Sequence, residues 1–309
     1  MYYLAMLFPA IKKFRISLSR DQIMLFMIAI NELLLGFETY SAHIISGTIV
    51  PREWVPILFA PISGIFLLLA GILFSRKRQT ASIIAGVVLL LSLIVGLLGT
   101  FYHINRAFLF TAPSGEQISV PLLVWAPPVL APLTFCLLSL LGISALWPEE
   151  PADSGILHLP RSKTFTLPFS KTRAYFFIAG LAIMATIISS VLDHSRTNFT
   201  NPWLWVPTAV GVFSCIIAIA LGVINKPNRA DIITYTSAML LMILTGLIGV
   251  VLHIQDDLTS QGIFVLERFV RGAPPLAPML FADMGAIGLI ALLNPADDNT
   301  HKTAPSQAE

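Results

Sequence analysis

The chain has 309 residues, of which 56% are hydrophobic and only 12% are charged, and its mean hydropathy is +0.80. Soluble domains carry about 25% charged residues, so this composition excludes a pair of ordinary soluble domains. The 19 glycines and 21 prolines are too few for a collagen-like or low-complexity chain, and a net charge of +2 gives no reason to expect a nucleic-acid partner. The remaining class is a protein that crosses a lipid bilayer several times.

The first residues, 1–21, place an apolar patch before a basic cluster, and we expect them to form an amphipathic arm on the membrane surface. A helix that crosses a bilayer needs about 20 mostly apolar residues. Eight stretches are predicted to be such helices: 22–47, 54–74, 81–104, 120–147, 173–191, 203–224, 232–254 and 276–293. The fourth contains Pro127, Pro128 and Pro132, so its first turns should be irregular or kinked.

The distribution of basic residues predicts the orientation of the chain. The N-terminal arm, the loops after the second, fourth and sixth spans and the C-terminal tail together hold 14 of the 19 lysines and arginines. Because basic residues accumulate on the cytoplasmic side, both termini should be cytoplasmic, and the bacterial inner membrane is the expected location.

An internal repeat divides the chain into two halves. The sequence GLLGTFYHI at 96–104 recurs as GLIGVVLHI at 246–254, an offset of 150, and APPVLAPL at 126–133 recurs as APPLAPML at 273–280. We therefore expect an all-α membrane protein made of two tandem four-helix bundles that face the same way. The first bundle is 22–147, a cytoplasmic linker is 148–172, the second bundle is 173–294, and a cytoplasmic tail is 295–309.

Four histidines end the odd-numbered spans on the outer side: His43, His103, His194 and His253. Small residues lie one turn before each, on the same helix face: Thr39, Gly99, Ser190 and Gly249. Gly96 and Gly246 lie a further turn back. This pattern predicts a flat gap in which His43 and His103, and likewise His194 and His253, bind the iron of a b-type haem, by analogy with membrane b-type cytochromes. A quinone headgroup is an alternative ligand.

The same pattern has a structural interpretation. Small residues at this spacing also allow membrane helices to pack closely, and a histidine at a helix end can bond to carbonyls. Asp193, Asp256 and Asp257 are candidate partners for the ring N–H groups if the histidines do bind a cofactor. Arg268 and Arg271, in a segment predicted as a short interfacial helix, are candidates for contact with haem propionates, lipid phosphates or a docked partner.

Three carboxylates lie deep within predicted spans: Glu32, Glu38 and Asp283. An ionised carboxylate there is costly, so each should be paired or protonated, and a proton relay is the functional prediction. The alternative is a carboxyl group that links neighbouring helices by hydrogen bonds. The positions equivalent to Glu32 and Glu38 in the second half are Ile183 and Ser189, so the relay would belong to the first half.

These features predict a membrane redox subunit that passes electrons between an outer-side dehydrogenase or cytochrome and the quinone pool. Two other classes stay open: a proton-coupled secondary transporter that uses the same carboxylates, and a structural or assembly anchor without a cofactor. No Walker A, GxSxG or HExxH motif is present, and the loops are too short for a soluble catalytic domain. Substrate chemistry beyond electron or proton transfer would therefore need a partner subunit.

Overall fold

The computed structural model describes residues 2–10, 18–45, 47–125, 128, 130–159 and 162–293, so the predicted tail lies outside the described residues. Helices dominate this part of the chain. They are α1 (Tyr2–Leu7), α2 (Arg20–Ile45), α3 (Trp54–Leu73), α4 (Arg78–Ala107), α5 (Val120–Trp125), α6 (Leu133–Leu146), α7 (Lys171–Ser195), α8 (Trp205–Val223), α9 (Arg229–Asp257), α10 (Leu266–Arg271) and α11 (Leu276–Ala291). Short 3₁₀ turns, Pro51–Glu53 and Pro202–Leu204, lead into α3 and α8.

Six of the described helices are long and apolar enough to cross a membrane: α2, α3, α4, α7, α8 and α9, with α3 and α8 counted together with their 3₁₀ turns. Their outward faces are apolar as well; Ile62, Ile65 and Leu69 on α3, for example, are about half exposed. Apolar surface of this kind is stable against lipid, not against water. The protein is therefore a helical membrane protein.

Two of the eight predicted spans are shorter as helices than the sequence suggests. The fourth stretch forms two helices, the six-residue α5 and the 14-residue α6, and the eighth forms α11, with 16 residues. The prolines explain why α6 is short. Helix α5 ends at Trp125, and the chain is α-helical again only past Pro132, because proline has no N–H to donate within a helix. None of these helices alone reaches the length of about 20 residues that crosses a bilayer.

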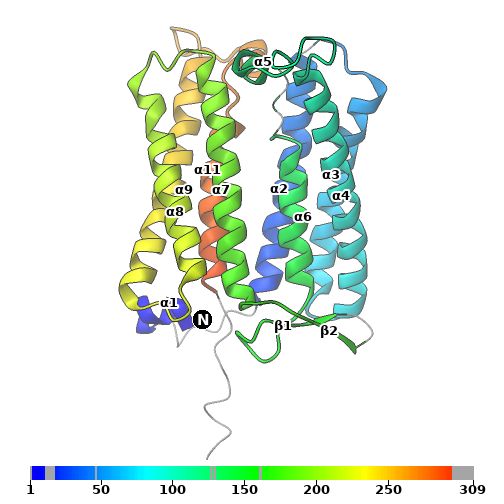
Figure 1. Cartoon of the computed structure of the whole chain (residues 1–309), viewed down its shortest axis with the longest axis vertical. Coiled ribbons are helices and arrows are strands. Elements are labelled where there is room, and N and C mark those ends of the chain that lie inside the picture. Colours follow the sequence, from blue (N-terminus) through cyan, green and yellow to red (C-terminus); the bar gives the residue numbers. More distant parts are fainter. Residues whose placement is uncertain are drawn as a thin grey trace, which may run out of the picture.

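The long helices stand side by side in two groups (Figure 1). In the first helix group, α3 packs against α2 and α4, and α6 packs against the same two helices. In the second helix group, α8 and α11 both pack against α7 and α9. The groups meet through α2 with α11 and α6 with α7. As a result, α2 and α4 lie diagonally across the first group, and α7 and α9 across the second.

The two ends of the molecule differ. The end where α2, α4, α7 and α9 finish is called the histidine end here, and α5 lies across it (Figure 1). At the other end, the linker end, residues 156–159 and 163–166 form a two-stranded antiparallel sheet of β1 (Ile156–Leu159) and β2 (Lys163–Thr166), which the sequence analysis did not anticipate. Helix α1 packs against α9, and Tyr3 is buried beside Phe176.

Candidate functional site

Two of the predicted histidines come together at the histidine end. His43 on α2 and His103 on α4 have ring centroids 6.3 Å apart, with the ring planes tilted by 58°. Both side chains are half-buried. They come from α2 and α4, the diagonal helices of the first helix group, so the two rings lie together at the histidine end of that group.

Backbone carbonyls orient three of the four rings. Nδ1 of His43 lies 2.7 Å from the Thr39 oxygen, that of His103 lies 2.9 Å from the Pro128 oxygen, and that of His253 lies 2.9 Å from the Pro274 oxygen. A carbonyl only accepts, so Nδ1 carries the hydrogen in each ring. In a neutral imidazole the lone pair then resides on Nε2, the nitrogen available to a metal or a proton donor.

The aspartates that are candidate partners for these rings have contacts of their own. Asp193 forms an ion pair with Arg196 at 3.7 Å, and Oδ1 of Asp257 accepts a hydrogen bond of 2.9 Å from the backbone N–H of Ala273. The Asp256 carbonyl accepts from Arg268. The hydrogen on Nδ1 of these three rings thus goes to a backbone carbonyl and not to an aspartate.

The second pair of histidines differs from the first. The ring of His194 packs edge-on against Phe199, with centroids 6.1 Å apart, and its Nδ1 lies 3.4 Å from the Ser190 hydroxyl. Among the described residues, no ring contact joins His194 to His253. The two helix groups therefore share the positions of their histidines but not the arrangement of the rings.

The predicted flat gap beside the glycines is filled. A Cβ atom on Gly99 would lie 2.9 Å from Cβ of Pro132, and one on Gly249 would lie 2.6 Å from Cβ of Pro278. Gly96 faces α6, where a Cβ would lie 2.6 Å from the Cys136 sulfur, and Gly246 faces α11 in the same way, 2.4 Å from the Ala282 nitrogen. These glycines allow close helix packing, so the space for a ligand cannot be beside them.

Glu32 is fully buried within the first helix group. Its two carboxylate oxygens accept hydrogen bonds from Ser63 on α3, at 2.8 Å, and from Ser92 on α4, at 2.6 Å. The carboxyl group thus links three helices. The equivalent positions in the second helix group are apolar at Ile183 and Met242, and only Ser214 keeps its hydroxyl.

Asp283 and Glu38 have different surroundings. Asp283 on α11 accepts a hydrogen bond of 2.8 Å from the Asn31 amide on α2, across the boundary between the helix groups, while its Oδ2 is buried without a partner. Glu38 is exposed. Among the described residues, no hydrogen bond joins one of the three carboxylates to another, so they form separate sites and not a continuous relay.

The loop arginine Arg268 uses part of its guanidinium to bind backbone carbonyls. Its Nε donates to the Asp257 carbonyl at 2.7 Å, and one Nη donates to the carbonyls of Asp256 and Leu258. Arg268 therefore caps the last turn of α9 from α10. The predicted interfacial helix exists but is short, only Leu266–Arg271, and the side chain of Arg271 lies outside the described residues.

A polar network at the linker end was not identified from the sequence. Lys171, at the start of α7, is fully buried and donates to Asp21 at 2.7 Å and to the Trp147 carbonyl at 2.7 Å. Arg20, at the start of α2, donates to Thr172 at 2.7 Å. A signal was present: Arg20 and Asp21 correspond to Lys171 and Thr172 at an offset of 151, the offset that relates His43 to His194.

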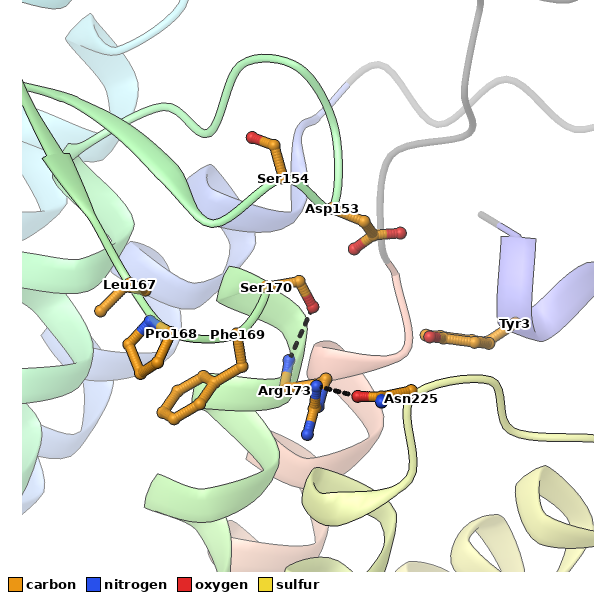
Figure 2. Close-up of a pocket in the computed structure, with 9 residues that line it drawn as sticks. All are labelled: Tyr3, Asp153, Ser154, Leu167, Pro168, Phe169, Ser170, Arg173 and Asn225. Atoms are coloured by element: carbon orange, nitrogen blue, oxygen red, sulfur yellow. Dashed lines mark hydrogen bonds between the residues drawn. The ribbon is translucent and has the colours of Figure 1, made fainter.

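A pocket of about 320 Å³ opens beside this network (Figure 2). Its lining includes Tyr3 of α1, Asp153 in the linker and Arg173 of α7. The Arg173 guanidinium donates to the Gly222 and Val223 carbonyls and to the Asn225 amide oxygen, and so caps the end of α8. The guanidinium of Arg173, a polar group of this pocket, thus already holds α7 against the end of α8.

Within the described residues, no group of three or more His, Cys, Asp or Glu side chains is arranged to hold a metal ion. A site built on His43 and His103 would therefore have two protein ligands. Comparison with known proteins gives no further guidance: no family model matches the chain, and no curated protein or solved structure is significantly similar to it.

Proposed function

We propose that this protein is an electron-transfer subunit of a membrane oxidoreductase, with a cofactor held by His43 and His103. The observation that carries the proposal is the approach of these two rings from diagonal helices, each with Nδ1–H donated to a carbonyl. A b-type haem is the cofactor that this donor set suits best, and a quinone headgroup is the alternative. When bound, haem would supply one-electron transfer.

The two rings are close enough for both residues to hold one metal group, since a metal–imidazole bond is about 2 Å long. The His43 and His103 centroids are 6.3 Å apart. The carbonyls of Thr39 and Pro128 would keep both rings oriented and make them better electron donors.

The remaining parts of this proposal rest on the sequence pattern. The pair His194 and His253 would form a second site after rearrangement of the His194 ring. The electron partners would be an outer-side dehydrogenase or cytochrome and the quinone pool. Glu32, Glu38 and Asp283 would exchange the associated protons one by one, since no hydrogen bond links them among the described residues.

The test is the reduced-minus-oxidised visible spectrum of the protein purified in mild detergent. We expect a haem spectrum whose contribution from the site at His43 and His103 is lost in His103→Ala and retained in His158→Ala, a change in the linker. Purified protein without haem, metal or extractable quinone would exclude the redox function. If His103→Ala and His253→Ala then alter only stability, the protein is a structural or assembly anchor.

A second function, proton-coupled secondary transport, is favoured by the Asn31–Asp283 contact. This hydrogen bond crosses the boundary between the helix groups, and the other Asp283 oxygen is buried without a partner. Protonation of that oxygen would therefore act on the contact between the two groups. Proton uptake into liposomes coupled to a solute, and abolished by Asp283→Asn, would support transport over electron transfer.

We also propose that the chain consists of two tandem four-helix units with eight spans and with both termini cytoplasmic. Matched contacts support the repeat: Gly71 packs on Phe26 and Gly222 packs on Phe177, each pair shifted by 151 residues. The hydrogen bonds at the linker end also follow the repeat, because equivalent residues of the two halves bond to each other's neighbours. Arg20 reaches Thr172 while Lys171 reaches Asp21, which is the pattern of an interface with two-fold symmetry.

Labelling with a membrane-impermeant maleimide tests the number of spans. Ser114, between α4 and α5, and Ser154, in the linker, are both exposed and are separated by α6. If α6 crosses the membrane, reagent outside the cell labels Ser114→Cys but not Ser154→Cys. Labelling of both positions from one side would show that α6 does not cross, and the eight-span topology would be wrong.

A further inference from the structure

We propose that Pro132 and Pro278 are positioning residues that fix the tautomer and orientation of His103 and His253. The inference rests on the proposed function only for what the rings would bind. Which ring nitrogen carries the hydrogen is a property of the protein itself, whether or not a cofactor is present.

The first step is the spacing of the prolines. Pro132 follows Pro128 by four residues, and Pro278 follows Pro274 by four. Pro128 and Pro274 lie just before α6 and α11, where a helix extended backward would give each carbonyl a hydrogen bond from the N–H four residues later. Proline has no N–H, so the carbonyls of Pro128 and Pro274 lack this donor.

The second step is what these carbonyls accept instead. The Pro128 oxygen accepts from the Ala131 N–H at 3.2 Å and from His103 Nδ1 at 2.9 Å. The Pro274 oxygen accepts from the Ala277 N–H at 3.2 Å and from His253 Nδ1 at 2.9 Å. A carbonyl has two lone pairs, and both are in use. A backbone N–H at position 132 or 278 would therefore compete with the histidine.

The third step is the packing of the proline rings. Pro132 covers Gly99 and Pro278 covers Gly249, each one turn from the histidine of the same helix. The proline thus sets the distance between the helices at the place where the ring must reach the carbonyl. Glycine, histidine and proline act as one set, Gly99 with His103 and Pro132, and this set recurs in the second helix group.

The consequence concerns Nε2. Donation from Nδ1 to the carbonyl leaves the lone pair of each neutral ring on Nε2. Nε2 is then the atom that binds a metal or accepts a proton, and the carbonyl determines the direction in which it points. Both prolines would thereby prepare the histidines for their ligand.

The experiment is nitrogen NMR of the full-length protein in detergent micelles, with ¹⁵N-labelled histidine and with signals assigned by His103→Asn and His253→Asn. The wild-type protein should show protonated Nδ1 at both positions. Pro132→Ala adds an N–H while keeping the Cβ that contacts Gly99. We expect it to lower the Nδ1–H to Nε2–H ratio of His103 about fivefold, the factor for a hydrogen bond of ~1 kcal/mol, and to leave His253 unchanged.

Pro278→Ala is the matched control, and it should change His253 and leave His103 unchanged. The inference is overturned if the wild-type protein carries the hydrogen on Nε2 at either ring, a result that needs no variant. It is also overturned if either proline variant leaves its own histidine unchanged or alters both rings equally. A colourless protein with the expected tautomers would refute the redox proposal alone.

Discussion

Glu32 shows how much one buried side chain contributes to the first helix group. The single hydrogen of Ser63 lies within reach of two acceptors, the Glu32 carboxylate at 2.8 Å and the Ala60 carbonyl at 2.7 Å. Glutamine at position 32 would accept from Ser92 and donate to Ser63, whose hydrogen would then remain on Ala60. Alanine would leave two buried hydroxyl groups and a cavity.

We therefore predict that Glu32→Gln changes the free energy of unfolding by less than ~1 kcal/mol, whereas Glu32→Ala lowers it by about 2–4 kcal/mol. Unfolding in a titration with denaturing detergent measures both. Glu38→Ala on the same helix is the control, because Glu38 does not bond to these serines, and its effect should be smaller than that of Glu32→Ala. Equal effects of the two alanine variants would mean that the serine contacts do not stabilise the protein.

The sequence was least able to distinguish which individual residues face a ligand and which only pack between helices. His43 and His103 were singled out by their place at helix ends, and the structure brings their rings together. From the sequence, the glycines beside His103 predict a gap for a ligand, because a glycine that accepts a neighbouring helix and one that faces a cofactor look the same in one sequence. Pro132, which fills that space, lies 29 residues beyond His103 in the chain.

At the scale of helices, the crossing of α4 and α6 depends on the absence of a side chain at Gly96. A Cβ there would lie 2.6 Å from the Cys136 sulfur and 2.9 Å from Cβ of Phe135. Gly86, on the same helix, would place its Cβ an ordinary 3.6 Å from Leu146.

We predict that Gly96→Ala destabilises the protein by about 1–3 kcal/mol, because either the helices must separate or side chains must leave their rotamers. Gly86→Ala should be neutral or slightly stabilising, since alanine is the better helix former. Thermal unfolding followed by circular dichroism in detergent compares the two variants. A neutral Gly96→Ala would show that α4 and α6 do not approach this closely.

Helices and strands of this protein differ in how well they can be predicted from the sequence. Six long helices follow from long apolar runs, and their bounds agree with the prediction within a few residues at most ends. The break before α6 follows from its prolines. The hairpin of β1 and β2 was not predicted, because strands of four residues in a polar segment have too little apolar alternation to be recognised.

At the scale of the whole molecule, the linker-end network joins the two helix groups. The Lys171 side chain is completely buried, and its partner Asp21 is only 15% exposed. Loss of one member of a buried ion pair leaves a charge without compensation, whereas loss of both costs much less.

We predict that Lys171→Met lowers the free energy of unfolding by about 3–5 kcal/mol and that Asp21→Asn in the same chain restores only part of it, because Asp21 also pairs with the buried Arg20 at 3.7 Å. Arg106→Met should cost less than ~1 kcal/mol, because Arg106 is half exposed in its pair with Glu53. The wild-type protein, the three single variants Lys171→Met, Asp21→Asn and Arg106→Met, and the double variant are compared by denaturing-detergent titration. Additive losses in the double variant would mean that the two residues act independently.

Each half of the molecule contains one thiol that its own packing shields from solvent. Cys136 on α6 lies against Gly96, and Cys215 on α8 lies near the Gly180 carbonyl, at 3.3 Å. A small alkylating reagent reaches either sulfur only when those helices part, so its rate of reaction reports local opening. Mass spectrometry of the two modified peptides would time the opening of each half separately, and we expect Gly96→Ala to speed modification at Cys136 alone.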